Sequence, residues 1–145
     1  MITNEVQYRA TKAHHAKFQE AIANIEREPV VSNESKRQML ELAALRSQAS
    51  DLEAEITEYE LLRSGSVTTF EAMSLAELAN ALVKARISKG WTQRQLAEAL
   101  GVAEQQVQRY EATGYSSASL ARLCDIAIAI GVEVREVVTF SIDAA

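Results

Sequence analysis

The chain has 145 residues, a length that fits one ordinary domain or a small domain with an appendage. Hydrophobic residues make up 48% of it and aromatic residues only 6%, while Ala, Leu, Glu and Gln abound, which is typical of a helical protein. No apolar run approaches the roughly 20 residues of a membrane span, the first residues do not form a secretory signal, and a single cysteine excludes a disulfide framework. We therefore expect a helical protein of the cytoplasm.

The net charge of −5 does not by itself favour a nucleic-acid partner, but the charges are segregated along the chain. Residues 84–109 hold five Lys and Arg against two Glu, a local balance of +3, whereas residues 51–60 are strongly acidic. Because DNA binding depends on local cations more than on the total charge, the basic segment is where a nucleic-acid contact would lie.

Two amphipathic helices are predicted in residues 1–66, on either side of the only proline, Pro29. Pro29 should end the first helix near Glu28, and Ser32 or Asn33 can cap the second. Side chains recur in both helices at spacings of three and four, as in a heptad seam; the positions are Tyr8, Thr11, His15, Phe18, Ile22 and Ile25, then Leu42, Leu45, Ala49, Leu52, Ile56 and Tyr59.

This pattern predicts an antiparallel, coiled-coil-like helical hairpin. Two narrow seams bury little surface, so the hairpin should be marginal alone and should pack against a second copy or against the C-terminal domain. It is interpreted as a structural spacer, a dimerisation arm or a docking surface for another protein.

The residues after the hairpin carry turn and strand signals. Ser64-Gly65-Ser66 predicts a helix stop in which Gly65 takes the left-handed conformation. Residues 67–70 are β-branched and aromatic, like 132–134 and 137–140. Two alternatives remain open there: a short terminal β pairing, or a helical turn that continues through 135–138.

Capping signals mark the starts of two helices in the C-terminal half. Ser74 is followed three residues later by Glu77, and the same spacing recurs at Thr92, so each can begin a helix with a capping box. The helices should cover 75–89 and 93–100.

A tight turn and a third helix, 103–112, should follow. Ala97 must be small where the third helix crosses above it, and Gly101 can adopt the positive φ of the turn. A helical-wheel count places Ala103, Val107 and Tyr110 on the buried face, and it turns outward Glu104, Gln105, Gln108 and Arg109. Gln suits adenine and Arg suits guanine in the major groove, each pairing contributing about 1–3 kcal/mol of discrimination.

Residues Arg86 to Val132 resemble the Xre/Cro family of phage-repressor-type regulators, which includes HigA-like antitoxins. The resemblance is carried by Thr92-Gln93-x-Gln95-Leu96-Ala97-x-x-Leu100-Gly101 and by Val107-Gln108-Arg109-Tyr110-Glu111. It implies a mainly α fold in which residues 67–145 form a lambda-repressor-like helix-turn-helix domain of four to five helices with a short C-terminal extension.

The resemblance also implies roles for particular residues. Base edges of DNA would be contacted by Glu104, Gln105, Gln108 and Arg109, and phosphates by Thr92, Gln93, Arg94, Tyr115, Ser116 and Ser117. Arg86 and Glu111 would form a structural ion pair beneath the fold. Ala103 replaces the usual capping Ser or Thr, and the loop 113–119 is uncharged, so we expect shallow salt dependence and a need for dimerisation.

The fourth helix of this domain, 119–130, spreads its apolar residues over roughly 200°, wider than one core-facing stripe needs. A two-fold mate, the hairpin or a terminal strand would cover its other flank, and Cys124 is expected to be a small core residue. No nucleophile with a base, phosphate loop or metal cluster is apparent, so we expect no enzymatic activity, no cofactor and no metal.

Two functions remain. The first is a nucleoid-associated regulator, an autorepressor that binds a palindromic operator as a homodimer. The alternative is an antitoxin whose N-terminal hairpin binds and neutralises a partner protein, for which the acidic hairpin suits a basic toxin.

Overall fold

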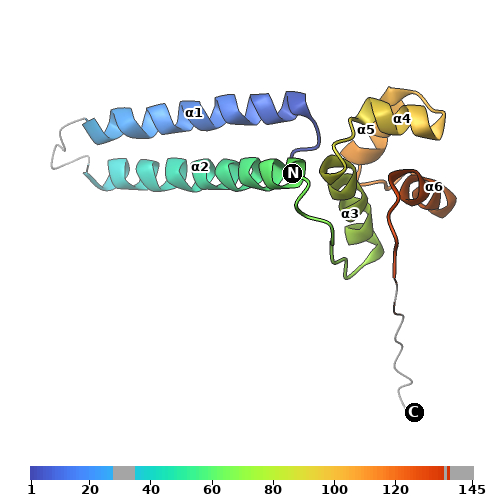
Figure 1. Cartoon of the computed structure of the whole chain (residues 1–145). Coiled ribbons are helices and arrows are strands. Elements are labelled where there is room, and N and C mark those ends of the chain that lie inside the picture. Colours follow the sequence, from blue (N-terminus) through green and yellow to red (C-terminus); the bar gives the residue numbers. More distant parts are fainter. Residues whose placement is uncertain (28–34, 136, 138–145) are drawn as a thin grey trace, which may run out of the picture.

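The structure is a computed structural model that describes residues 1–27, 35–135 and 137. The described residues form an N-terminal helical hairpin and a bundle of shorter helices at its base (Figure 1). The helices are α1 (Glu5–Arg27), α2 (Ser35–Arg63), α3 (Leu75–Ser88), α4 (Gln93–Leu100), α5 (Glu104–Ala112) and α6 (Leu120–Ile130). This mainly α architecture, with a four-helix C-terminal domain, confirms the predicted fold class. None of the described helices combines the length and apolarity that crossing a membrane requires.

α1 and α2 pack against each other along the predicted seams. Every predicted seam residue is buried or half-buried, whereas most of the intervening positions are exposed. The buried seam residues are Ile22, Ala49, Ile56 and Tyr59. α1 ends at Arg27, close to the predicted end, while Pro29 and the two proposed capping residues of α2 lie outside the described residues.

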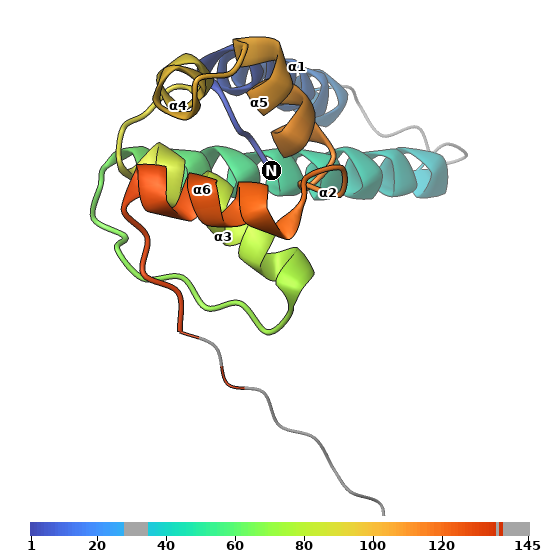
Figure 2. The ribbon, with the colours of Figure 1, turned by 90° about the vertical axis from the view of Figure 1, so that its right-hand side faces the viewer.

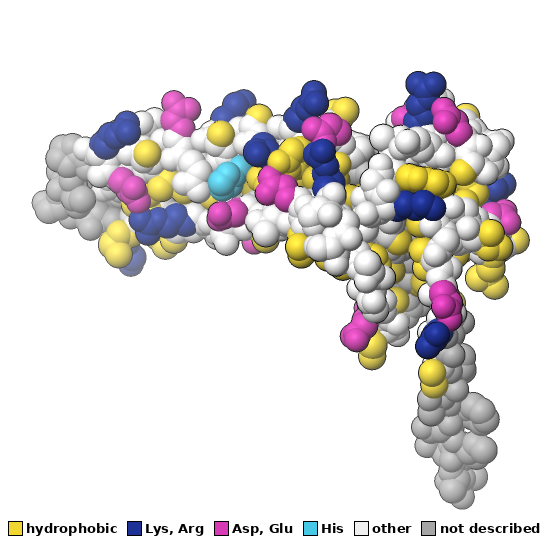
Figure 3. All heavy atoms as spheres, in the orientation of Figure 1, with side chains coloured by type: hydrophobic (Ala, Val, Ile, Leu, Met, Phe, Trp, Pro, Cys, Tyr) yellow, Lys and Arg dark blue, Asp and Glu magenta, His cyan; other side chains and the backbone are white. Residues whose placement is uncertain are grey.

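Polar contacts hold the two helices in register along their edges. Arg46 of α2 pairs with Glu26 of α1 at 2.6 Å, and the hydroxyl of Tyr8 donates to Glu60 near the other end of the hairpin. This bond lowers the pKa of the Glu60 carboxyl. Basic and acidic side chains are interspersed on the face of the hairpin that Figure 3 shows, and the acidic residues within 51–60 are exposed or half-buried.

The base of the hairpin shares one hydrophobic core with the helices that follow it. Ile56, Tyr59 and Leu62 of α2 belong to the same cluster of buried side chains as Leu82 and Val83 of α3. Ile2, which precedes α1, is 3% exposed and joins this cluster. The hairpin therefore packs against its own C-terminal domain, one of the two predicted solutions to its narrow seams.

α3 to α6 surround the C-terminal part of the core (Figure 2). Ser74 begins α3 and its side chain accepts a hydrogen bond from the backbone of Glu77, as its spacing predicted. The second bond of a capping box would run from the Ser74 backbone to the Glu77 side chain. Here the Glu77 carboxylate accepts from the backbone of Met73 instead. Gly65 has φ of +71° after the end of α2, which agrees with the predicted helix stop.

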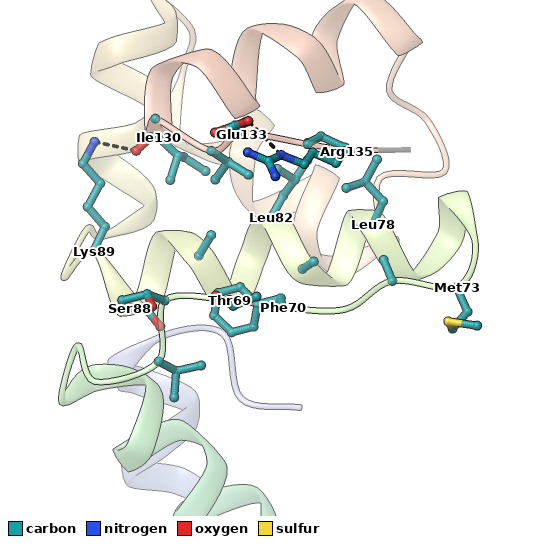
Figure 4. A pocket seen from close by; sticks show the side chains of 18 of the residues that line it. Thr69, Phe70, Met73, Leu78, Leu82, Ser88, Lys89, Ile130, Glu133 and Arg135 are labelled. Carbon is teal, nitrogen blue, oxygen red and sulfur yellow. Dashed lines mark hydrogen bonds and ion pairs between the residues drawn. The ribbon is translucent and has the colours of Figure 1, made fainter. Parts of the chain in front are cut away.

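The terminal β pairing does not form among the described residues. Residues 67–70 and 132–135 are neither strand nor helix. Thr69 and Phe70 lie on one side of α3, and Glu133 and Arg135 lie on the other, so the helix separates the two segments (Figure 4). Backbones on opposite sides of a helix cannot reach the spacing of paired strands, about 4.8 Å. Residues 138–140 of the predicted strand lie outside the described residues.

α6 turns a second apolar flank outward. Ile126 and Ile130 are buried in the core, but Leu120, Cys124 and Ile128 are exposed along the opposite flank. The prediction that Cys124 is a core residue is therefore wrong, because the helix faces the core with positions 126 and 130 instead. The wide apolar arc predicted for this helix is confirmed, and the described residues leave part of it uncovered.

Candidate nucleic-acid interface

The turn between α4 and α5 has the local geometry that the sequence predicts. The Thr92 side chain accepts from the backbone of Gln95, while the Gln95 amide oxygen accepts from the backbone of Thr92, which completes a capping box. α4 ends at Gly101, whose φ of +65° lies in the left-handed region that glycine reaches without strain. Ala97 is 2% exposed. Ala97 and Gly101 thus determine the position of the turn between α4 and α5.

Apolar side chains then hold α4 and α5 together. Leu96 and Val107 are 0% and 1% exposed, and Leu100, Val102 and Tyr110 pack around them. α5 begins at Glu104, with Ala103 in the capping position and no side chain to accept a backbone hydrogen bond. Ala103 is exposed, contrary to the helical-wheel count, because it precedes the first turn of the helix.

The outward face of α5 carries four polar side chains. Glu104, Gln105, Gln108 and Arg109 are all exposed, as predicted. The only hydrogen bond among them within the described part of the chain runs from the Gln108 amide to the Glu104 carboxylate, at 3.2 Å. Gln105 and Arg109 therefore present unengaged donors toward solvent, and this is the hydrogen-bonding capacity that base edges in a major groove require.

Four of the six residues predicted to contact phosphate are at the surface. Thr92, Arg94, Ser116 and Ser117 are exposed. The Arg94 guanidinium pairs with Glu98 at 3.0 Å, and that hydrogen bond raises the pKa of Arg94. Serine hydroxyls and the free backbone amides at a helix start are groups that hold phosphates in protein–DNA complexes.

The other two predicted phosphate contacts, Gln93 and Tyr115, are turned inward. Gln93 is 6% exposed, and its amide nitrogen donates to Glu111 at 2.8 Å. Tyr115 has a φ of +60°, stacks on Tyr110 with ring centroids 6.0 Å apart, and has a buried hydroxyl without a partner among the described residues. Burial also raises the pKa of the Tyr115 phenol. Both side chains are therefore buried, unlike the other four residues predicted to contact phosphate.

Arg86 and Glu111 form the predicted ion pair beneath α5. Both side chains are almost fully buried, and the guanidinium binds both carboxylate oxygens, with Nε to Oε1 at 2.6 Å and a terminal nitrogen to Oε2 at 2.7 Å. Arg86 also donates to the backbone carbonyls of Trp91 and Thr3. A bidentate pair in which every guanidinium nitrogen is hydrogen-bonded is the geometry that stabilises a buried charge.

Sequence reasoning missed the contribution of the first four residues. The Thr3 carbonyl accepts from Arg86 at 2.7 Å, and the Asn4 amide donates to Gln93 at 3.2 Å. One signal was present, because Asn4 caps α1 through the backbone of Gln7 and this pair has the spacing of a helix start. Nothing in that local spacing indicates contact with residues more than 80 positions away.

Comparison with known proteins agrees with this geometry. Residues 82–137 match the family model described as helix-turn-helix. That part of the chain belongs to the Xre/lambda-repressor-type helix-turn-helix family. A domain of this family supports a DNA-binding transcriptional regulator, with DNA as a partner. No curated protein and no solved structure matches the chain.

Most cations of this helix-turn-helix regulator's basic segment are already engaged within the protein. Lys84 pairs with Glu58 of the hairpin at 2.7 Å, while Lys89 donates to a carbonyl at the end of α6 and lies over the Trp91 ring. Arg86 and Arg94 are paired as described. Arg109 forms no ion pair with any residue that the structure describes. The local balance of +3 therefore overstates the charge available to DNA.

No metal centre is apparent in the described ranges. No group of three or more His, Cys, Asp or Glu side chains within them is arranged to hold a metal ion. The outward face of α5 offers DNA hydrogen-bond donors and, in Arg109, a cation that has no ion-pair partner among the described residues.

Proposed function

We propose that this regulator represses its own operon by reading the major groove of duplex DNA with α5. The observation that carries the proposal is the outward face of α5, where Gln105 and Arg109 stand exposed beside Glu104 and Gln108. In a helix-turn-helix, the second helix enters the major groove and places residues of its first turns against base edges. The four side chains occupy those turns, so Gln105 and Arg109 are the residues that select the operator.

Backbone contacts in this proposal come from both ends of the motif. Thr92 and Arg94 lie at the start of α4, and Ser116 and Ser117 lie in the loop that follows α5. Such contacts set the register of the protein on the duplex and carry no sequence information. Arg109 is the only cation of the described basic segment that forms neither an ion pair nor a side-chain hydrogen bond within the described residues, so each monomer neutralises few phosphates, and its affinity should fall only gently as salt increases.

Weak monomer binding supports a homodimer as the active species. Two copies related by a two-fold axis place their recognition helices in successive major grooves, about 34–36 Å apart, and therefore require a palindromic operator. One domain alone has too few free cations to bind DNA tightly.

A gel-shift titration tests the proposal, using the full chain and the DNA upstream of its own gene at two salt concentrations. Gln105→Ala and Arg109→Ala should each lower the ratio of operator to random-duplex affinity by about 5- to 150-fold, which corresponds to the loss of one base contact. Gln48→Ala and Arg37→Ala are matched controls, because both residues are exposed on the hairpin. If the α5 variants discriminate as well as the controls do, α5 is not the reading helix.

The second candidate function is an antitoxin, and the exposed apolar surface of α2 favours it. Met39 and Leu40 are 68% and 65% exposed near the start of α2, and Ala43 and Ala44 beside them are exposed as well. A cluster of this kind away from the core is typical of a protein-binding surface. In this alternative the hairpin binds a toxin while the helix-turn-helix domain controls the operon.

Co-purification decides between the two. The full chain is produced together with the product of the neighbouring gene and is compared with the Met39→Asp/Leu40→Asp variant. Binding that this variant loses supports the antitoxin function, and the absence of any complex leaves the autorepressor.

A further inference from the structure

The first four residues of the chain, here called the N-terminal segment (Met1–Asn4), contact the start of α4. The amide nitrogen of Asn4 donates to Oε1 of Gln93, the first residue of α4, at 3.2 Å. Gln93 is 6% exposed, and its side-chain amide is engaged at both atoms, since the oxygen accepts from Asn4 and the nitrogen donates to Glu111. The N-terminal segment is thus in direct contact with the amino end of α4.

Four further contacts anchor the N-terminal segment. Ile2 is buried in the common core, and the Thr3 carbonyl accepts from the Arg86 guanidinium at 2.7 Å. The charged amino group of Met1 pairs with Glu55 of α2 at 3.0 Å. The Asn4 side chain also caps α1, because its Oδ1 accepts from the backbone of Gln7 at 2.9 Å. The segment is therefore an ordered part of the structure that ties the hairpin to the helix-turn-helix domain.

The N-terminal segment also reaches the recognition helix. Asn4 and Gln7 line the same hollow as Gln93 and as Gln108 of the outward face of α5. The first turn of α1 and the reading face of α5 are consequently neighbours. DNA placed along α5 would approach the N-terminal segment closely.

The amino end of α4 is a place where DNA needs access. In a helix-turn-helix the first helix crosses the DNA backbone, and free amides at a helix start bind phosphate. We propose that the N-terminal segment competes with the DNA backbone for the amino end of α4, so that tight DNA binding requires the segment to withdraw. This inference rests on DNA binding through α4 and α5. By linkage, whatever loosens the segment strengthens DNA binding, and DNA loosens the segment.

Asn4→Ser provides a selective test. Ser caps a helix as well as Asn does, so α1 keeps its start, but the amide that binds Gln93 is lost without a change of charge. Asn24→Ser is the matched control, because Asn24 is exposed at the far end of α1. Because backbone contacts are independent of sequence, the probe is a short fluorescent duplex of random sequence, and its binding is followed by anisotropy at low salt.

Asn4→Ser should bind this duplex about 2- to 10-fold more tightly than the parent, the factor that one neutral hydrogen bond represents. Asn24→Ser should bind like the parent. In a Gln93→Ala background, Asn4→Ser should give no further gain, because the hydrogen bond that it removes is already absent. Thermal unfolding of each variant verifies that it is folded. Equal or weaker binding by folded Asn4→Ser overturns the proposal, because the segment then does not oppose DNA.

Hydrogen exchange of the parent protein gives a second readout that requires no substitution. With saturating duplex, the amides of residues 2–8 should exchange faster than in the free protein. Unchanged or slower exchange would contradict competition between the segment and DNA. The segment would then either stabilise the fold or contact the DNA itself. If neither the parent nor any variant binds this duplex or the upstream DNA, the DNA-binding function itself fails; binding without a gain in Asn4→Ser removes only the competition.

Discussion

Replacing Arg86 with Met tests the buried ion pair beneath α5. The substitution removes the guanidinium and roughly preserves the side-chain volume. The Glu111 carboxylate, which is 0% exposed, then keeps only the Gln93 amide as a donor, and the carbonyls of Thr3 and Trp91 lose theirs. Leaving one member of a buried ion pair without its partner costs about 3–5 kcal/mol.

This cost should be visible in both chemical and thermal unfolding. For a protein of this size, 1 kcal/mol shifts the melting temperature by about 2–4 °C, so Arg86→Met should lower it by roughly 6–20 °C. Urea titration followed by circular dichroism gives the free energy of unfolding directly. Arg94→Met is the matched control, because Arg94 forms an exposed pair with Glu98 and its loss should change stability little.

The double variant Arg86→Met/Glu111→Leu separates the pair from its surroundings. Removing both charges should be less costly than the sum of the two single changes, because neither charge is then buried alone. A destabilisation by Arg86→Met of less than about 1 kcal/mol, which is the scale of a surface pair, would refute the assignment of a buried structural brace.

Three further predictions concern the turn and the helices around it. Gly101→Ala should cost about 1–2 kcal/mol of unfolding free energy because its φ is +65°, and Gly101→Asn less; equal costs in urea titrations would contradict the φ argument. Ala97→Leu should cost about 1–3 kcal/mol because it overpacks the crossing of α4 and α5, while Ala99→Leu on the exposed face of α4 should be nearly neutral in the same titrations. Ala103→Ser should stabilise the protein by about 1 kcal/mol by capping α5, and a melting temperature that does not rise would show that the cap is already satisfied by solvent.

Features set by neighbouring residues could be predicted from the sequence. The capping box at Thr92 and the heptad seams depend on contacts between residues three or four positions apart, the turn glycine depends on its own backbone conformation, and the structure confirms all three. At Ser74 only the side-chain half of the predicted box forms. The outward face of α5 could also be predicted from the sequence, because Val107 and the helix-turn-helix spacing determine which side of the helix is buried. Local periodicity is sufficient where one face of an element is clearly apolar.

Features set by distant packing could not be predicted. Cys124 looked like a core residue because α6 is apolar on most sides, and only the placement of Ile126 and Ile130 decides which flank is buried. Gln93 and Tyr115 are polar residues next to a predicted surface, yet Glu111 and Tyr110 hold them inside. Their burial depends on three-dimensional neighbours that no spacing along the chain encodes.

The length of the hairpin has a mechanical consequence for a protein that binds DNA at one end. α2 has 29 residues, so a rigid hairpin of this kind is a lever of about 43 Å. A tilt of about 5° at the end that is rooted in the common core sweeps the tip through about 4 Å. Conversely, a partner that pushes on the tip acts with the full length of the arm on Ile56, Tyr59 and the helices they touch. Small forces far from the DNA can therefore be converted into torque on the domain that reads it.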